Sequence, residues 1–355
     1  MSNKKILFAV GTRPNIMKLA PLYREFKKHT SFELYVMHTG QHYDFEMSKV
    51  FFEDLDLPDP DFYLGINKSS SIHQIAEIMK KTEEVAMNLR PDMTFVFGDV
   101  NSTMAISVAV KKIKIKLAHV EAGLRSFDRS MPEETNRIIV DTISDIHFVT
   151  EKSGIENLKR EGHAENSIFL VGNTMIDSLV YVLKKIHPVN DTEPYILLTL
   201  HRPHNVDIKE NLLNILSAIK EARGNLRVIF PAHPRTKKNI EKFGLSDFLN
   251  DFEIIPPMGY RAFVKLMKNA KLVITDSGGI QEETTYLGIP CITVRDNTER
   301  PITVEMGTNT LAGTSKDSII RTIQKVLKYG KKGKIPPLWD GKTAMRIRKI
   351  TEEIL

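Results

Sequence analysis

Acidic side chains stand at the ends of apolar, strand-like runs in the first half of the chain. Asp99 follows the run 93–98, and Glu121 ends the next such run. A carboxylate in that place is costly to desolvate, which favours a functional role for both Asp99 and Glu121 over a purely structural one. Glu133 and Glu134 open a predicted helix, where acids also complement the helix dipole, and we expect one of them to do only that. Carboxylates grouped in this way shift one another's pKa values and can divide acid and base work.

A glycine pair marks the corresponding point in the second half of the chain. Ser277, Gly278 and Gly279 follow the apolar run 272–275 and open a predicted helix. Glycines there expose backbone N–H groups at a helix start, where those donors and the helix dipole favour phosphate. Glu283, one turn into the helix, could accept hydrogen bonds from a ribose. The spacing is neither a Walker A loop nor G-x-G-x-x-G, which argues against an NTPase, and a simple glycine-assisted turn is the alternative.

Two cations follow the first strand-like run, 5–10. Arg13 lies between a glycine turn and a proline suited to a first helical position, and Lys18 follows about one turn later. Both could face an anion bound at the end of the strand. A surface turn with a solvated arginine is the alternative.

Histidines follow two of the later strand-like runs. His201 and His204 are three residues apart, but no cysteine joins them and a nearby proline opposes a helix, so a zinc site is disfavoured. We expect His201 to contact a phosphate or another leaving group. His233 is equally compatible with a ligand contact and with a histidine that only completes a strand end.

The elements that must position these residues alternate regularly along the chain. Short apolar runs rich in β-formers are followed by longer segments of helical periodicity. Strands that are apolar on both faces and separated by crossover helices predict parallel sheets covered on both sides. The ligands of such sheets bind at the carboxyl ends of the strands. We predict strands at 5–10, 33–39, 93–98, 116–121, 146–149, 167–171, 195–200, 226–230, 271–275 and 291–295.

The alternation predicts an α/β fold of two Rossmann-like, doubly wound domains. The polar segment 184–194, which contains two prolines, places the junction between about 172 and 194. We expect an N-terminal domain over 1–180 with the carboxylates and a C-terminal domain over 181–340. Residues 341–355 are predicted to form a helix that packs back on the first domain. The default ligand site is a cleft between the two domains.

Composition narrows the classes of function. The chain has 355 residues, 41% of them apolar, which is enough to bury more than one core. It has no long apolar stretch, and its start resembles no signal peptide, so we expect a cytoplasmic protein without a membrane partner. Cys291 is the single cysteine, which excludes an intrachain disulfide. The net charge of +6 arises from 321–355, where ten Lys and Arg face three Asp and Glu; without interleaved aromatics this favours a solvated helix over a nucleic-acid site.

Taken together, several runs resemble one family and are collinear with it from residue 11 to about 313. They are Gly11-Thr12-Arg13-Pro14, Thr39-Gly40-Gln41-His42, Gly98-Asp99, His119-Val120-Glu121-Ala122-Gly123-Leu124-Arg125, Pro132-Glu133-Glu134-Thr135-Asn136-Arg137, Gly172-Asn173-Thr174, Asp276-Ser277-Gly278-Gly279-Ile280-Gln281-Glu282-Glu283 and Arg295-Asp296-Asn297-Thr298-Glu299-Arg300-Pro301. The chain therefore resembles the non-hydrolysing UDP-N-acetylglucosamine 2-epimerases. This resemblance implies a glycosyltransferase-B-like fold, a homodimer, and no need for a metal or redox cofactor.

The resemblance also implies a reaction and the residues that perform it. UDP would be eliminated from UDP-N-acetylglucosamine to give a glycal, and its re-addition would give UDP-N-acetylmannosamine, a precursor for cell-surface polysaccharides. The C2 proton is only weakly acidic, so the departing pyrophosphate must be assisted electrostatically. By the family's motifs, the roles fall on Asp99, Glu121 and Glu133 as acid/base groups, His201 at the departing phosphate, Arg13 and Lys18 near the phosphates, and Ser277, Gly278, Gly279 and Glu283 at the UDP portion. Arg300 is predicted to be a further substrate-binding residue.

Departures from the common bacterial pattern keep other readings open. Asn15, His204 and Ile302 stand where acidic residues are frequent, so a 2-epimerase for a modified UDP-N-acetyl sugar is an alternative substrate assignment. A UDP-sugar glycosyltransferase, a hydrolysing relative and a non-catalytic binding protein are the alternative functions. Bacterial members bind a second UDP-N-acetylglucosamine as an activator, and the contacts that match are Gln41, His42 and His233.

Overall fold

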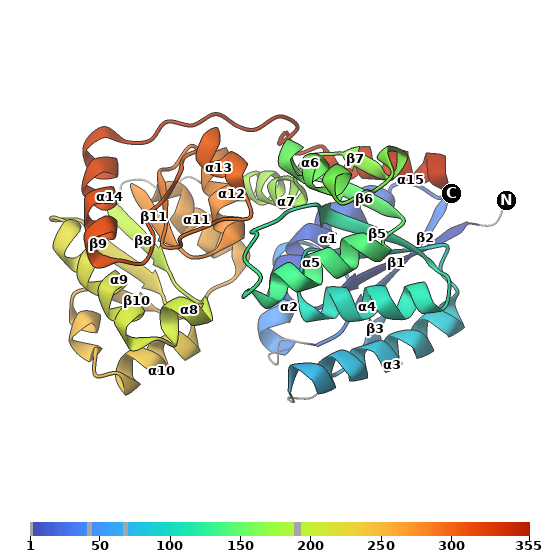
Figure 1. The fold of residues 1–355 in the computed structure, drawn as a ribbon, viewed down its shortest axis with the longest axis horizontal. Helices are drawn as coiled ribbons and strands as arrows, with labels where there is room; N and C mark the ends of the chain where they lie inside the picture. The colour runs from blue at the N-terminus through green and yellow to red at the C-terminus, as the bar shows by residue number, and fades with distance from the viewer. Residues whose placement is uncertain (1–2, 41–44, 67–69, 188–192) are drawn as a thin grey trace. The chain divides into compact units, whose positions relative to one another are not determined.

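The computed structural model describes residues 3–40, 45–66, 70–187 and 193–355. Within them the chain divides into two compact units. The first comprises Met1–Tyr181 together with Pro337–Leu355, and the second comprises Val182–Pro336 (Figure 1).

The described part of the first unit contains a seven-stranded parallel sheet in the order β3-β2-β1-β4-β5-β6-β7. Its central strands are buried along most of their length, as expected for a sheet covered on both faces. The strands are β1 (Lys4–Val10), β2 (Phe32–His38), β3 (Phe62–Tyr63), β4 (Met93–Phe97), β5 (Lys116–Ala122), β6 (Ile146–Val149) and β7 (Ile168–Leu170).

Helices cover the sheet of the first unit. The neighbours α3, α4 and α5 pack side by side, whereas α1 packs against α15, the last helix of the chain (Figure 1). The helices are α1 (Arg13–Phe26), α2 (Phe45–Asp54), α3 (Ser71–Leu89), α4 (Asn101–Lys112), α5 (Pro132–Ile143), α6 (Lys152–Arg160), α7 (Thr174–Leu183), which crosses the unit boundary, and α15 (Thr343–Ile354).

The second unit repeats this plan, with a six-stranded parallel sheet in its described residues, in the order β10-β9-β8-β11-β12-β13. Its strands are β8 (Tyr195–Thr199), β9 (Arg227–Pro231), β10 (Glu253–Ile255), β11 (Leu272–Thr275), β12 (Cys291–Thr293) and β13 (Asn309–Leu311). Its helices are α8 (Pro203–Val206), α9 (Lys209–Ala222), α10 (Pro234–Lys242), α11 (Tyr260–Asn269), α12 (Gly278–Leu287), α13 (Pro301–Glu305) and α14 (Lys316–Tyr329).

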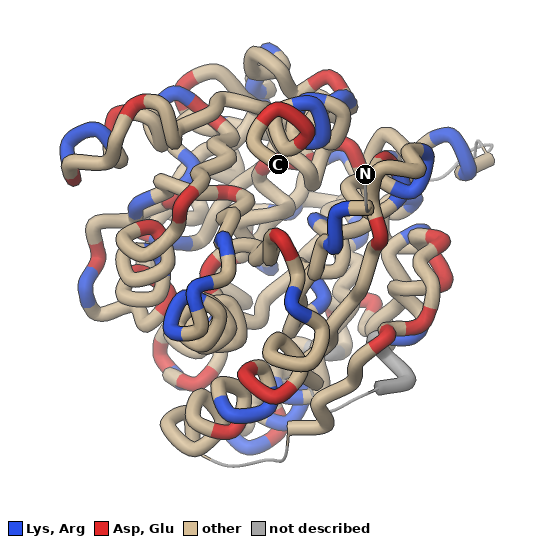
Figure 2. The backbone as a smooth tube through the Cα atoms, turned by 90° about the vertical axis from the view of Figure 1, so that its right-hand side faces the viewer, with Lys and Arg blue, Asp and Glu red and all other residues tan. Residues whose placement is uncertain are grey.

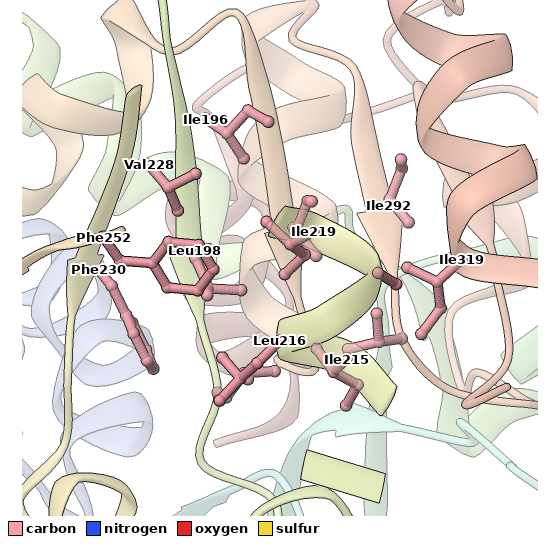
Figure 3. Close-up of a cluster of buried hydrophobic side chains, with 14 of the residues drawn as sticks. Ile196, Leu198, Ile215, Leu216, Ile219, Val228, Phe230, Phe252, Ile292 and Ile319 are labelled. Atoms are coloured by element: carbon pink, nitrogen blue, oxygen red, sulfur yellow. The ribbon is translucent and has the colours of Figure 1, made fainter. Parts of the chain in front are cut away.

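The core of the second unit forms where α9 lies on the sheet. Figure 3 shows Ile215 and Ile219 of α9 among side chains from β8, β9, β12 and α14, including Leu198 and Phe230. These side chains are fully buried. Apolar residues recur along α9 with helical periodicity and form one face of the helix. Burial of this face holds the helix on the sheet.

The C-terminal segment returns to the first unit. The indole N–H of Trp339 donates to the carbonyl of Thr150 at 3.2 Å, and the Asp177 carboxylate accepts from the N–H groups of Thr343 and Ala344 at 3.1 and 2.8 Å. The two hydrogen bonds to Asp177 anchor the start of α15 on α7.

Figure 2 shows acidic and basic positions interspersed along the backbone in the view that carries both chain ends.

The predicted α/β class with parallel sheets is confirmed, but three short strands were missed. β3, β10 and β13 each contain two or three residues and form sheet edges. β3 has only two residues, and β10 and β13 begin with the polar residues Glu253 and Asn309, so none of them shows the continuous apolar run by which β7, also an edge strand, was predicted. Among the described residues, no helix is long and apolar enough to cross a membrane.

Candidate active site

Glu121 sits at a backbone irregularity at the end of β5. Its φ is +74°, and the pairing of β5 with β6 shifts register between Val120 and Ala122. A non-glycine residue in this left-handed region is held there by its surroundings rather than by its own preference. The Glu121 carboxylate is buried and forms an ion pair with the buried Lys18 ammonium. β5 therefore delivers a carboxylate and α1 delivers its cation to one point.

The glycine before Asp99 makes room for this ion pair. Gly98 follows β4 with a φ of +62°, and a Cβ there would lie 2.8 Å from Lys18 Nζ and 3.1 Å from Glu121 Oε2. Gly98 therefore carries the backbone past the pair to Asp99. The Asp99 carboxylate is partly exposed and receives a hydrogen bond from Arg137 at 2.5 Å. The structure thus places Asp99, Glu121 and Lys18 in one neighbourhood of the first unit.

The two acids that open α5 differ in their surroundings. Glu134 is buried and accepts from the N–H groups of Ser126 and Phe127, at 2.9 and 3.0 Å, and from Arg137 at 2.6 Å. Burial acts to raise the pKa of Glu134, but the hydrogen bonds from Ser126 and Arg137 outweigh it and lower that pKa. Glu134 holds the loop before α5, whereas Glu133 is half buried.

The turn after β1 is tied to the end of β4 by Asn15. The Asn15 Oδ1 accepts from the N–H of Thr12 at 3.1 Å, and its Nδ2 donates to the carbonyl of Phe97 at 2.8 Å. This residue, which departs from the bacterial pattern, thus positions the start of α1. Arg13 is half buried, with its guanidinium 5.8 Å from the centre of the Phe51 ring.

Asp141 is a site residue that sequence reasoning missed. It is fully buried in α5, and its two oxygens accept from His119 Nδ1 at 2.6 Å and from the N–H of Gly123 at 3.0 Å. These partners lie on either side of Glu121, so Asp141 braces the irregularity that presents that carboxylate. Arg125 lies 2.7 Å from the same group. Burial acts to raise the pKa of Asp141, but His119 and Arg125 hold it well below its ordinary value. An acid within an amphipathic helix gives no such signal in the sequence.

In the second unit, the predicted phosphate loop opens a helix. Ser277 is the N-cap of α12, and Gly278 and Gly279 begin the helix, whose first N–H groups have no partners within it. A Cβ at Gly278 would lie 2.3 Å from Arg300 Nη1, so only a glycine lets this guanidinium approach the backbone. Arg300 is buried with Glu282, at 2.8 Å, and Glu299, at 2.5 Å. The start of α12 thus combines backbone donors with a fixed cation.

Glu283 is buried one turn into α12. Its Oε1 accepts a hydrogen bond from the Tyr260 hydroxyl at 2.5 Å. Burial raises the pKa of Glu283 to about 8, with the neighbouring Glu282 adding to the effect, although the Tyr260 hydrogen bond opposes it. Tyr260 is a second residue that sequence reasoning missed, because a tyrosine in an amphipathic helix is typical of a core position.

His201 and Asp276 pair at the ends of the neighbouring strands β8 and β11. His201 Nδ1 lies 2.9 Å from Asp276 Oδ1; the histidine side chain is half exposed and the aspartate is fully buried. His204 is exposed and contacts Asn211. His233 is exposed at the N-cap of α10, where its ring accepts from the N–H of Arg235 at 3.2 Å.

Gln41 and His42 lie outside the described residues. Within the described ranges, no group of three or more His, Cys, Asp or Glu side chains is arranged to hold a metal ion. The first unit brings together Lys18, Asp99 and Glu121. In the second unit, His201 contacts Asp276, which directly precedes the N-cap of α12, and Arg300 lies against Gly278 at the start of that helix.

Comparison with known proteins matches the chain to one family. A family model described as UDP-N-acetylglucosamine 2-epimerase matches residues 24–352. The chain belongs to this family. It is an epimerase, and thus an isomerase, and the resemblance inferred from its motifs is confirmed.

The similar proteins include one from Methanocaldococcus jannaschii named UDP-N-acetylglucosamine 2-epimerase. It is 44% identical over 98% of each chain. A crystal structure of the enzyme from that organism, in complex with UDP-GlcNAc and UDP, has a TM-score of 0.93 and 43% identity, covering 98% of this epimerase and 99% of that chain. A 38% identical relative from Pseudomonas aeruginosa, aligned over 91% of this chain and 92% of its own, is named UDP-2,3-diacetamido-2,3-dideoxy-D-glucuronate 2-epimerase.

Proposed function

We propose that this epimerase interconverts UDP-N-acetylglucosamine and UDP-N-acetylmannosamine by eliminating UDP and adding it back. The observation that carries the proposal is the full-length likeness to the M. jannaschii enzyme crystallised with UDP-GlcNAc and UDP. The two chains share 43% identity and the same fold along their length. The geometry within each unit supplies groups suited to the two halves of such a reaction.

The first unit supplies the proton-transfer groups. We assign Glu121, Asp99 and Glu133 to proton removal and delivery at C2 of the sugar. Because the C2 hydrogen is weakly acidic, its removal must be coupled to departure of UDP from C1. Lys18 beside Glu121 provides a fixed positive charge where negative charge develops, and we assign Arg13 to the phosphates.

The second unit supplies the groups that hold UDP. We assign the diphosphate to the N–H groups at Ser277, Gly278 and Gly279, with Arg300 behind them. Glu283 is assigned to the ribose, and His201 to the phosphate that departs with UDP. A phosphate held in this way is stabilised as a leaving group before the glycal forms.

A second substrate assignment is supported by one observation. The relative named for UDP-2,3-diacetamido-2,3-dideoxy-D-glucuronate is 38% identical to this chain, so family membership leaves the sugar open. Supplying each nucleotide sugar separately to the purified protein decides between them. The sugar with the higher kcat/KM is the substrate.

The proposed reaction is tested by proton NMR in D2O with UDP-N-acetylglucosamine as the sole substrate. Solvent deuterium should enter C2, and UDP-N-acetylmannosamine should appear while free UDP stays a minor species. A glycosyltransferase would need an acceptor, and a hydrolysing relative would release UDP in proportion to turnover. Absence of exchange at C2 of UDP-N-acetylglucosamine would refute the proposal, and exchange with the diacetamido sugar alone would favour the second substrate assignment.

A further inference from the structure

A histidine and a carboxylate face each other across two neighbouring strands of the second unit. Thr199 of β8 and Thr275 of β11 are register partners, with their hydroxyls 2.7 Å apart. The residues that follow are therefore brought together as the strands end, and His201 Nδ1 lies 2.9 Å from Asp276 Oδ1. An ionised carboxylate can only accept hydrogen bonds, so this contact requires the proton of His201 to be on Nδ1.

Asp276 also holds the backbone from which His201 projects. It accepts from the N–H of His201 at 3.0 Å, from the N–H of Arg202 at 2.9 Å and from Asn205 Nδ2 at 3.3 Å. Burial acts to raise the pKa of Asp276, but His201 and these donors outweigh it and lower that pKa, which keeps the carboxylate ionised at neutral pH. A single buried side chain thus fixes both the loop and the ring.

The exposure of the two side chains shows which nitrogen is available to a ligand. The Asp276 side chain is fully buried, whereas half of the His201 side chain is exposed. With Nδ1 turned toward the buried carboxylate, Nε2 lies at the other end of the ring. Nε2 is then the nitrogen that takes up a proton, and in the imidazolium form it donates to an anion.

We propose that Asp276 is a positioning residue for epimerisation, which holds His201 in the Nδ1–H tautomer and so presents Nε2 to the departing phosphate. This inference rests on the proposed function, in which His201 contacts that phosphate. Because the buried carboxylate already orients the ring, the ring loses less rotational freedom when the phosphate binds. Asp276 acts through His201 and does not itself touch the substrate.

The tautomer can be observed directly in the unmodified protein. Two-bond ¹⁵N–¹H correlation spectra of ¹⁵N-histidine-labelled wild type, recorded where His201 is neutral, should show His201 with the Nδ1–H pattern. The signal is assigned by its absence from the spectrum of His201→Asn. In Asp276→Asn the pattern should change to a mixture of tautomers or to Nε2–H. An Nε2–H tautomer in the wild type would overturn the inference without any variant.

Kinetics then distinguish positioning from a purely structural role. Asp276→Asn should lower kcat by on the order of ten- to a hundredfold, because loss of the orienting carboxylate can cost a histidine up to ~10⁴ in kcat. The Kd for UDP should stay within about threefold. Asp207→Asn is the matched control, since Asp207 lies in the same segment but pairs with exposed Arg235.

A double-mutant cycle isolates the coupling. In a His201→Asn background, Asp276→Asn should change kcat by less than about threefold, because the residue through which it acts is gone. An equal loss in both backgrounds would show that Asp276 supports only the fold and would overturn the inference. If Asp276→Asn does not fold, the wild-type spectrum still decides.

The outcomes separate this inference from the proposed function. If the wild type fails to epimerise either sugar but His201 shows the Nδ1–H tautomer, the proposed function fails and the assignment of Asp276 to the histidine stands. If the wild type epimerises and Asp276→Asn keeps at least half of its turnover, the positioning role alone is wrong.

Discussion

The Glu121 and Asp99 carboxylates each have a basic partner, Lys18 and Arg137, in the first unit. We predict that Glu121→Gln and Asp99→Asn each lower kcat at least roughly a hundredfold, as for loss of a general acid or base. The Kd for UDP, measured by titration calorimetry, should change little, because neither carboxylate is among the groups assigned to UDP and their basic partners are retained. Glu156→Gln, which removes an exposed carboxylate from α6, is the control. Near-normal turnover in both site variants would show that the acid/base assignment is wrong.

Glu283 makes stability depend on pH in a direction that its burial determines. Burial raises its pKa from an ordinary 4.5 to about 8, so between these pH values the folded chain binds more protons than the unfolded chain. Stability therefore falls as pH rises through this range. Glu283→Gln keeps the neutral form, so its free energy of unfolding lacks this fall. The free energy of unfolding of the variant minus that of the wild type should therefore increase from pH 5 to pH 8, by on the order of a few kcal/mol.

Urea denaturation at several pH values measures this gain. Tyr260→Phe is the companion variant: it removes a hydrogen bond that favours the carboxylate form, so the fall in stability should extend to higher pH. A constant difference between Glu283→Gln and the wild type from pH 5 to 8 would show that Glu283 is ionised throughout.

At the scale of elements, the end of β5 depends on a close contact between two glycines. Gly123 has a φ of +79°, and a Cβ there would lie 2.4 Å from the carbonyl oxygen of Gly154 in α6. Gly162 has a similar φ of +87° but has nothing within 4 Å of such a Cβ. Gly162→Ala should therefore cost only the backbone strain, about 1 kcal/mol, whereas Gly123→Ala should cost several kcal/mol because backbone must move.

Trp339, the only tryptophan, is buried in the first unit, so its fluorescence during urea denaturation reports the unfolding that compares these variants. Gly123→Ala should also lower kcat, since the shifted backbone adjoins Glu121. Equal stability losses for the two alanine variants would show that the Gly123–Gly154 contact is not rigid.

The sequence predicted the elements with strong local signals and missed those that depend on partners far along the chain. Continuous apolar runs predict buried strands such as β4, whereas the two residues of β3 gain their strand geometry from pairing with β2. The same holds at the site. Glycines and prolines mark the turns at Arg13 and Ser277, but the role of Asp141 exists only once α5 lies on β5.

At the scale of the whole molecule, the chain leaves the first unit near Tyr181 and returns to it at Pro337. α15 then packs on α1, with Ile347 fully buried. We predict that Ile347→Ala lowers the stability of the first unit by about 2–4 kcal/mol through the cavity it leaves. Ile335→Ala makes the same chemical change at a half-exposed position of the second unit. It should leave the urea midpoint of the first unit unchanged.

The two units give separate readouts of the Ile347 variant. Trp339 fluorescence follows the first unit, and UDP titration follows the groups assigned to the second. The urea midpoint from fluorescence should fall in Ile347→Ala while the Kd for UDP stays within about twofold, because α15 packs on the first unit and most of the groups assigned to UDP lie in the second. These groups are Ser277, Gly278, Gly279, Glu283 and Arg300. An unchanged midpoint would mean that the first unit does not depend on α15; a large loss of UDP binding would mean that the two units do not respond independently.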